Sequence, residues 1–166
     1  IYGFRGADLD AYLRARTAAD RRHALGTNWR SHSALVRAVD AVFSAPARPF
    51  VLDGVCHPRL AAAGEADARA LAGCALPPLV WWTFEPETAK GQTKPVAKGA
   101  IRPRIREAVV HEVRRLLGAG VTVGGRALRP SDLAVLVSRN AEAAEMQAAL
   151  RLAGVPSTVA RGGDVT

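Results

Sequence analysis

The sequence Pro130-Ser131-Asp132-Leu133-Ala134-Val135-Leu136-Val137 ends in five consecutive apolar residues. An apolar run of this kind is typical of a central strand in a parallel sheet, because helices cover both faces of such a sheet. Asn140 then caps a predicted helix that Gly154 and Pro156 end, and residues 155–160 resume as a predicted strand. A strand, a helix and a strand at this spacing form a right-handed crossover unit. The β-α-β segment 130–160 therefore predicts an α/β fold, with a parallel sheet and flanking helices.

Apolar residues three or four positions apart predict three more helices. The first is capped by Asp8 and carries Leu9, Tyr12 and Leu13 on one face, the second is capped by Ser31 and ended by Pro46, and the third covers residues 105–117. The stretch Leu79-Val80-Trp81-Trp82-Thr83-Phe84 lies between prolines and predicts a buried strand, with at least one of the two tryptophans in the core.

The composition indicates one soluble domain with a polyanionic partner. The chain has 166 residues, 49% of them hydrophobic, and a formal net charge of +8. Such a charge favours nucleic acid or a nucleotide over a membrane, since no apolar run approaches spanning length. The basic residues are 20 arginines and only 3 lysines, and alanine is abundant. A GC-rich coding sequence would give the same pattern, so charge alone does not establish a nucleic-acid partner.

Cysteine and histidine usage argues against a disulfide framework and against a metal site. Cys56 and Cys74 are the only cysteines, and no secretion signal precedes them, so we expect the reducing cytoplasm. A structural metal site needs about four ligands at workable spacing. Cys56-His57 with a distant Cys74 does not supply them, and we expect no metal ligands in this chain.

Six basic residues and no acidic residue lie between Thr88 and Arg106. Glycine and proline recur through the segment at the same spacing as the basic residues, which disfavours a regular helix. We therefore predict a flexible basic loop over residues 88–104. Such a loop is either solvated or in contact with a nucleic-acid backbone.

The stretch Thr27-Asn28-Trp29-Arg30-Ser31 places an aromatic ring beside an arginine, just before a predicted helix. An aromatic ring that can stack on a base, next to a guanidinium that is always charged and donates several hydrogen bonds, is suited to binding a nucleotide. The alternative is a buried tryptophan and a surface arginine that happen to adjoin.

The chain lacks the motif that cradles the phosphates of ATP. No G-x-x-x-x-G-K-[S/T] occurs, nor does an adjacent acidic pair that could hold magnesium. The chain also begins without methionine inside a segment that reads as structured. We therefore expect a piece of a larger protein, inactive by itself and binding no cofactor alone.

Three stretches resemble the superfamily 1 DNA helicases of the UvrD and RecB type. Residues 1–8 look like the tail of helicase motif III, and residues 28–31 resemble motif IV. Residues 130–137 and 148–157 are similar to the segment that precedes the large insertion in the second motor domain. The three matches follow the order of the family and bracket nearly the whole chain.

This resemblance implies that residues 1–166 are an incomplete second RecA-like motor domain, which is a P-loop NTPase type of α/β fold. It implies that Trp29 stacks on the adenine of ATP and that Arg30 is the catalytic residue that reaches the γ-phosphate. ATP with Mg²⁺ would bind only in the complete protein. The resemblance further implies that Tyr2 and Phe4 stack on single-stranded DNA while Arg5 contacts its backbone or couples it to nucleotide.

The same resemblance implies a helicase and exonuclease of recombinational double-strand-break repair. Single-stranded and double-stranded DNA would be its substrates, and RecC-like and RecD-like subunits would be its partners. Two alternatives of other classes stay open: a stand-alone nucleic-acid-binding α/β module without ATPase activity, and an α/β interaction scaffold.

Overall fold

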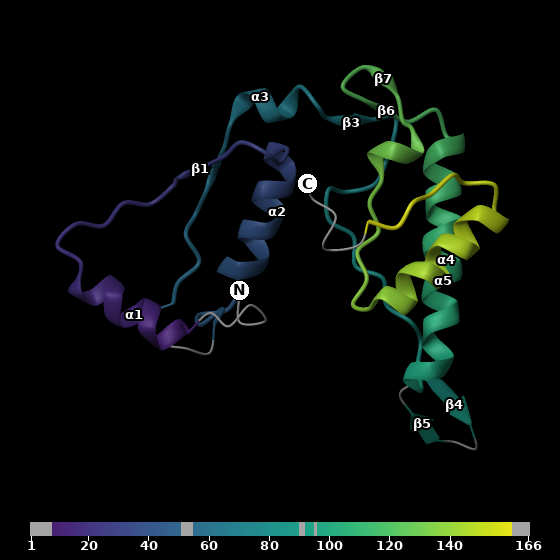
Figure 1. The fold of residues 1–166 in the computed structure, drawn as a ribbon, viewed down its shortest axis with the longest axis horizontal. Coiled ribbons are helices and arrows are strands. Elements are labelled where there is room, and N and C mark those ends of the chain that lie inside the picture. The colour runs from purple at the N-terminus through teal and green to yellow at the C-terminus, as the bar shows by residue number, and fades with distance from the viewer. Residues whose placement is uncertain (1–7, 51–54, 90–91, 95, 161–166) are drawn as a thin grey trace. The chain divides into compact units, whose positions relative to one another are not determined.

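The computed structural model describes residues 8–50, 55–89, 92–94 and 96–160. The chain divides into two compact units, Ile1–Ala68 and Arg69–Thr166. Figure 1 shows the helices and strands of both. We describe each unit by itself.

The first unit contains a β-α-β arrangement. Strand β1 (Thr27–Asn28) pairs in parallel with β2 (Ala61–Ala62), and helix α2 (Ser33–Ser44) lies between them in sequence. Two backbone hydrogen bonds of 2.9 Å, one from Ala61 to Gly26 and one from Ala63 to Asn28, hold the pair together. Residues Val36, Ala63 and Ala66 are buried, so the core of the unit lies where α2 covers this short sheet.

Two further helices complete the first unit. Helix α1 (Leu9–Ala18) begins where Asp8 accepts hydrogen bonds from the backbone nitrogens of Asp10 and Ala11, as the sequence predicts. No residue of α1 is buried, however. Helix α3 (Gly64–Asp67) follows β2 directly.

The second unit packs two helices against each other and carries two small sheets. Helices α4 (Lys98–Gly118) and α5 (Asn140–Leu152) share an apolar core formed by Val113, Met146, Leu150 and Val155. Strands β3 (Leu71–Ala72), β6 (Thr122–Val123) and β7 (Arg126–Ala127) form an antiparallel sheet, and β4 (Glu87–Ala89) pairs with β5 (Gln92–Lys94) in a hairpin. A short 3-10 helix, η2 (Pro130–Asp132), leads toward α5.

Three predicted strands of the second unit are not formed within the described residues. Residues 79–84 pair with no described strand. Trp81 and Trp82 are 74% and 47% exposed, so neither lies in the core. Residues 133–137 and 155–160 are likewise unpaired, and Leu136 is 95% exposed. The reason is that an apolar run becomes a strand only when a neighbouring strand pairs with it. Of the run 133–137, Leu133 packs against the helical core.

The prediction of a flexible loop over residues 88–104 is wrong for most of that range. The hairpin β4–β5 occupies its first part, and α4 begins at Lys98 and includes Pro103. An interior proline removes one backbone hydrogen bond and costs helical stability. Two contacts join this part of α4 to α5, since Arg102 lies 3.1 Å from Glu142 and Arg106 forms an ion pair with Glu145.

The architecture is thus a mixture of helices and small sheets, with β1 and β2 as the parallel pair among the described residues. The β-α-β arrangement that the sequence predicts at 130–160 is instead found around α2. None of the helices in the described ranges combines the length and the apolar character needed to cross a membrane.

Candidate functional site

Trp29 and Arg30 directly follow β1, at the carboxyl end of the parallel pair. In α/β sheets, ligands bind outside the carboxyl ends of parallel strands. Trp29 is 63% exposed, which rules out the alternative of a buried tryptophan. Arg30 is exposed, and within the described part of the chain its guanidinium has neither a hydrogen-bond nor an ion-pair partner. The structure therefore presents an aromatic face and an uncommitted cation next to each other.

Asn28 shapes the loop that carries these two side chains. Its Oδ1 atom accepts hydrogen bonds of 2.9 Å from the backbone nitrogens of both Arg30 and Ser31. This is an Asx turn, in which a side chain replaces the backbone carbonyl that would otherwise close the turn. The turn fixes the direction in which the backbone leaves β1 and so fixes the positions of Trp29 and Arg30.

The start of α2 differs from the predicted cap at Ser31. His32 is the N-cap, and its Nδ1 atom accepts a hydrogen bond of 3.1 Å from the backbone nitrogen of Ala34. Asp67, the last residue of α3, accepts a hydrogen bond of 2.7 Å from the backbone nitrogen of Ser33. Ser31 was predicted to cap because serine is a common cap. Its backbone is instead held in the turn closed by Asn28.

Electrostatics hold Asp67 in its charged form. The backbone N–H and the hydroxyl of Ser33 keep the pKa of the Asp67 carboxyl below its usual range, and the charge of the nearby Arg37 acts in the same direction. The Nε2 atom of His32 lies 3.6 Å from Asp67 Oδ1. Because His32 accepts through Nδ1, the neutral ring carries its proton on Nε2, which faces this carboxylate.

A small cavity of about 110 Å³ lies beside this loop, lined by Asn28, Ser31 and the apolar face of α2. Asp40 and His57 also line it, and His57 Nε2 lies 3.1 Å from Asp40 Oδ1. This volume is well below the roughly 300–1,000 Å³ that is typical of small-molecule pockets. Nucleotide contact through this loop would thus use its exposed surface.

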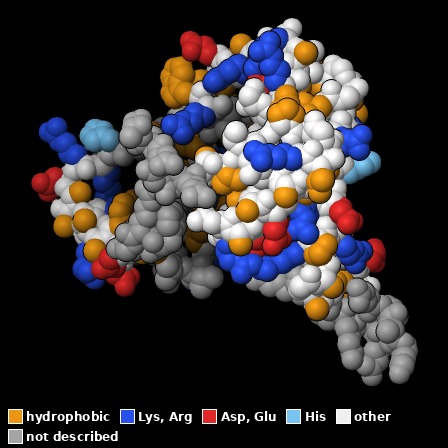
Figure 2. All heavy atoms as spheres, turned by 45° about the vertical axis from the view of Figure 1, so that its right-hand side comes forward, with side chains coloured by type: hydrophobic (Ala, Val, Ile, Leu, Met, Phe, Trp, Pro, Cys, Tyr) orange, Lys and Arg blue, Asp and Glu red, His pale blue; other side chains and the backbone are white. Residues whose placement is uncertain are grey.

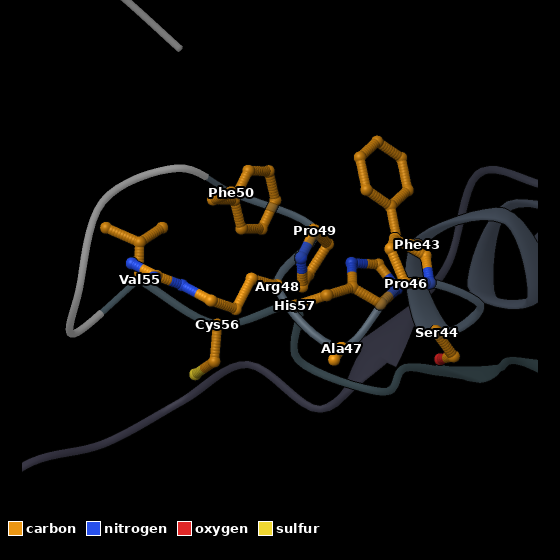
Figure 3. A pocket seen from close by; sticks show the side chains of 10 residues that line it. All are labelled: Phe43, Ser44, Pro46, Ala47, Arg48, Pro49, Phe50, Val55, Cys56 and His57. Carbon is orange, nitrogen blue, oxygen red and sulfur yellow. The ribbon is translucent and has the colours of Figure 1, made fainter.

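A second, wider pocket lies at the end of α2 and has a volume of about 360 Å³ (Figure 3). The ring of Phe43 stacks on His57 with centroids 5.0 Å apart, and on Phe50 with centroids 5.6 Å apart. The thiol of Cys56 points away from the imidazole of His57 in Figure 3. The Cys56-His57 pair therefore lacks the geometry of a nucleophile and its base.

The basic residues of α4 are largely engaged within the protein. Arg102 and Arg106 pair with acids of α5, and Arg104 lies over the ring of Phe84 at 5.6 Å. On the face shown in Figure 2, basic side chains are scattered, and several lie beside acidic ones. This arrangement weakens the interpretation of the basic segment as a nucleic-acid contact, because paired arginines neutralise fewer phosphates.

The predicted DNA contacts Tyr2, Phe4 and Arg5 lie outside the described residues. Among residues 8–50, 55–89, 92–94 and 96–160, no group of three histidine, cysteine, aspartate or glutamate side chains is placed to hold a metal ion. The two residues that shape the loop, Asn28 and Asp67, are not among the site residues predicted from the sequence. Asn28 could have been found from its place before a helix start, since asparagine closes such turns. Asp67 gives no local signal, because it lies 34 residues from its partner Ser33.

Sequence comparison with known proteins identifies the relatives of this chain. The RecBCD enzyme subunit RecB of Mycobacterium tuberculosis is 33% identical over 170 residues, which cover 99% of this chain and 15% of that protein. The RecBCD enzyme subunit RecB of Escherichia coli K12 is 30% identical over 167 residues, which cover 95% of this chain and 14% of that protein. No protein-family profile matches the chain.

A shorter match has higher identity. The RecBCD enzyme subunit RecB of Haemophilus influenzae is 44% identical over 55 residues, or 33% of this chain. The chain spans about 15% of the length of the curated relatives that it matches over nearly its whole length. Over that segment, the chain belongs to the RecB family.

Proposed function

We propose that this chain is part of the second RecA-like motor domain of an ATP-dependent DNA helicase and exonuclease of recombinational repair. One observation carries the proposal: Trp29 is exposed, Arg30 is exposed without a side-chain partner in the described part of the chain, and both follow the carboxyl end of a parallel strand. The relatedness to RecB subunits supports it, since their name assigns them to the RecBCD enzyme.

In this proposal the chain supplies half of an ATP site. Trp29 stacks on the adenine, and Arg30 reaches the γ-phosphate across a cleft that the first motor domain completes. Negative charge spreads over the γ-phosphoryl oxygens in the transition state, and a positioned guanidinium stabilises it. Comparable arginines accelerate phosphoryl transfer by roughly 10³- to 10⁵-fold.

The proposal gives this chain no role in holding Mg²⁺. Among the described residues, no group of three histidine, cysteine, aspartate or glutamate side chains is placed to hold a metal ion. Metal ligands and the phosphate-binding loop would come from elsewhere in the complete protein.

DNA and partner contacts extend the proposal beyond the described residues. Tyr2 and Phe4 would stack on bases of single-stranded DNA, and Arg5 would contact the backbone or couple DNA to nucleotide. Double-stranded DNA would be the substrate to be unwound, RecC-like and RecD-like subunits would be partners, and the cytoplasm would be the compartment.

The test is the substitution Arg30→Ala in the full-length protein. We expect ATP hydrolysis to fall by roughly 10³-fold or more, while ATP binding changes little, because the guanidinium acts on charge that develops in the transition state. Arg22→Ala is the matched control, since Arg22 is an exposed arginine eight positions upstream. Normal turnover by Arg30→Ala would refute the assignment.

A nucleic-acid-binding module without ATPase activity is the second candidate. The net charge of +8 and the exposed Arg21 and Arg22 favour it, since neither arginine has a partner among the described residues. Tight binding of single-stranded DNA by residues 1–166, weakening steeply with salt, would support this candidate. Weak binding would favour the incomplete motor domain.

A further inference from the structure

The loop that carries Trp29 and Arg30 is held at both ends, by the side chain of Asn28 at the end of β1 and by that of Asp67 at the end of α3. Asn28, at the end of β1, holds the backbone nitrogens of Arg30 and Ser31. Asp67 belongs to α3, which follows the parallel strand β2, and it holds the backbone nitrogen of Ser33. The backbone on either side of Arg30 is therefore fixed by side chains within three residues.

We propose that Asp67 is a positioning residue for Arg30, acting from helix α3 through Ser33 and His32 at the start of α2. The inference rests on the proposed function of Arg30. Asp67 itself would touch neither ATP nor DNA.

Two contacts and one nearby charge link Asp67 to the start of α2. Its Oδ1 atom lies 2.7 Å from the nitrogen of Ser33 and 3.6 Å from Nε2 of His32, and Arg37 adds a favourable charge. Glu65 is also on α3, but it is exposed and its carboxylate has no partner among the described residues. Only one of the two acids on this helix therefore reaches the loop.

The contact of Asp67 with Ser33 restricts where the guanidinium of Arg30 can lie. Arg30 stands three residues before Ser33, so a shift of the start of α2 moves the backbone that carries Arg30. A displacement of about 1 Å of a group that acts in the transition state can lower the rate roughly 10²-fold. Losing the contact of Asp67 with Ser33 frees the start of α2 to make such a shift.

The experiment compares kcat for ATP hydrolysis in the full-length protein. We expect Asp67→Ala to lower kcat roughly 10- to 100-fold. Asp67→Asn keeps an oxygen that accepts from Ser33, so we expect it to recover much of that loss. Glu65→Ala removes the same charge from the same helix and should leave kcat unchanged.

A variant on the donor side covers the case in which Asp67→Ala does not fold. Ser33→Pro removes the backbone N–H that donates a hydrogen bond to Asp67. Proline is nevertheless favoured at the first position of a helix, which Ser33 occupies. The preceding residue, His32, already has φ −53° and ψ 142°, which a following proline requires. We expect Ser33→Pro to fold and to lower kcat as Asp67→Ala does.

Combination with Arg30→Ala separates a positioning role from a structural one. If Asp67 acts through Arg30, Asp67→Ala lowers the residual single-turnover rate of Arg30→Ala no further. An equal fall in both backgrounds, or an unchanged kcat in Asp67→Ala and Ser33→Pro, would overturn the inference. If Arg30→Ala itself turns over normally, the proposed function falls and this inference with it. An inactive Arg30→Ala beside a fully active Asp67→Ala refutes the inference alone.

Discussion

The guanidinium of Arg126 and the carboxylate of Asp132 form a bidentate ion pair, with Nη1 2.7 Å from Oδ2 and Nη2 2.6 Å from Oδ1. The pair ties β7 to η2, and Asp132 also accepts a hydrogen bond of 2.8 Å from the backbone nitrogen of Arg129. Parallel hydrogen bonds of this kind are the strongest geometry for an arginine and a carboxylate.

This pair predicts a pH dependence of stability. Arg126 lowers the pKa of Asp132 from 3.8 to about 2, with help from the nitrogen of Arg129. Because the folded-state pKa is depressed, the pair contributes fully above pH 3.8, and its contribution is lost as the pH falls toward 2. We expect Asp132→Asn to lower the thermal midpoint at neutral pH and to flatten its fall in this acid range. Asp20→Asn, at an exposed acid without a described partner, should change neither.

The Asx turn at Asn28 predicts a second stability effect. Asn28→Ala removes the acceptor of two backbone hydrogen bonds, and we expect a loss of about 1 kcal/mol in the free energy of unfolding. Asn28→Asp keeps an acceptor oxygen and should lose less. Urea denaturation of both variants measures the difference. Equal losses in the two variants would mean that the turn does not depend on this oxygen.

The exposed ring of Trp29 predicts an effect on nucleotide affinity. Under the proposed function, Trp29→Ala removes a stacking contact worth about 1–3 kcal/mol, which corresponds to roughly 5- to 150-fold weaker ATP binding. Trp29→Phe keeps an aromatic face and should retain most of the affinity. Trp81→Ala, at another exposed tryptophan, serves as the control in an ATP titration. Unchanged affinity in Trp29→Ala would remove the adenine contact from the proposal.

The shared core of α4 and α5 predicts a contrast between two leucines of one helix. Leu150 is 7% exposed and packs in the core, whereas Leu152 is 91% exposed. We expect Leu150→Ala to cost about 2–5 kcal/mol of unfolding free energy, because it leaves a cavity. Leu152→Ala should cost less than about 0.5 kcal/mol. Thermal and urea unfolding of the two variants provide the measurement, and similar costs would contradict the observed core.

Helices could be predicted from this sequence because their signals are local. Asp8 caps α1 as predicted, and the apolar spacing from Leu35 onward indicates α2. The helix predicted over 105–117 forms, but it begins at Lys98 and includes Pro103, in a stretch where Arg102 and Arg106 form ion pairs with α5. The periodicity of a sequence carries no information about such partners.

The strands could not be predicted, and neither could the contact of Asp67 that holds the loop carrying Trp29 and Arg30, because both depend on residues distant in sequence. Apolar runs at 79–84 and 133–137 have the composition of strands but no pairing partner in the described ranges. The pairing of β1 with β2 joins residues 34 positions apart through alanines that carry no strand signal. The exposed placement of Trp29 and Arg30 agrees with the nucleotide interpretation, while their roles stay predictions.

The apolar run Leu133–Val137 has a practical consequence for work with this segment. Leu133 packs against the helical core, but residues 134–137 are exposed, contain no proline and pair with no strand in the described ranges, so they offer an edge to which another chain can add as a strand. We therefore expect residues 1–166, expressed alone, to self-associate and to precipitate as their concentration rises. Leu136→Lys, at a position that is 95% exposed, should keep such a preparation in solution without loss of folding stability.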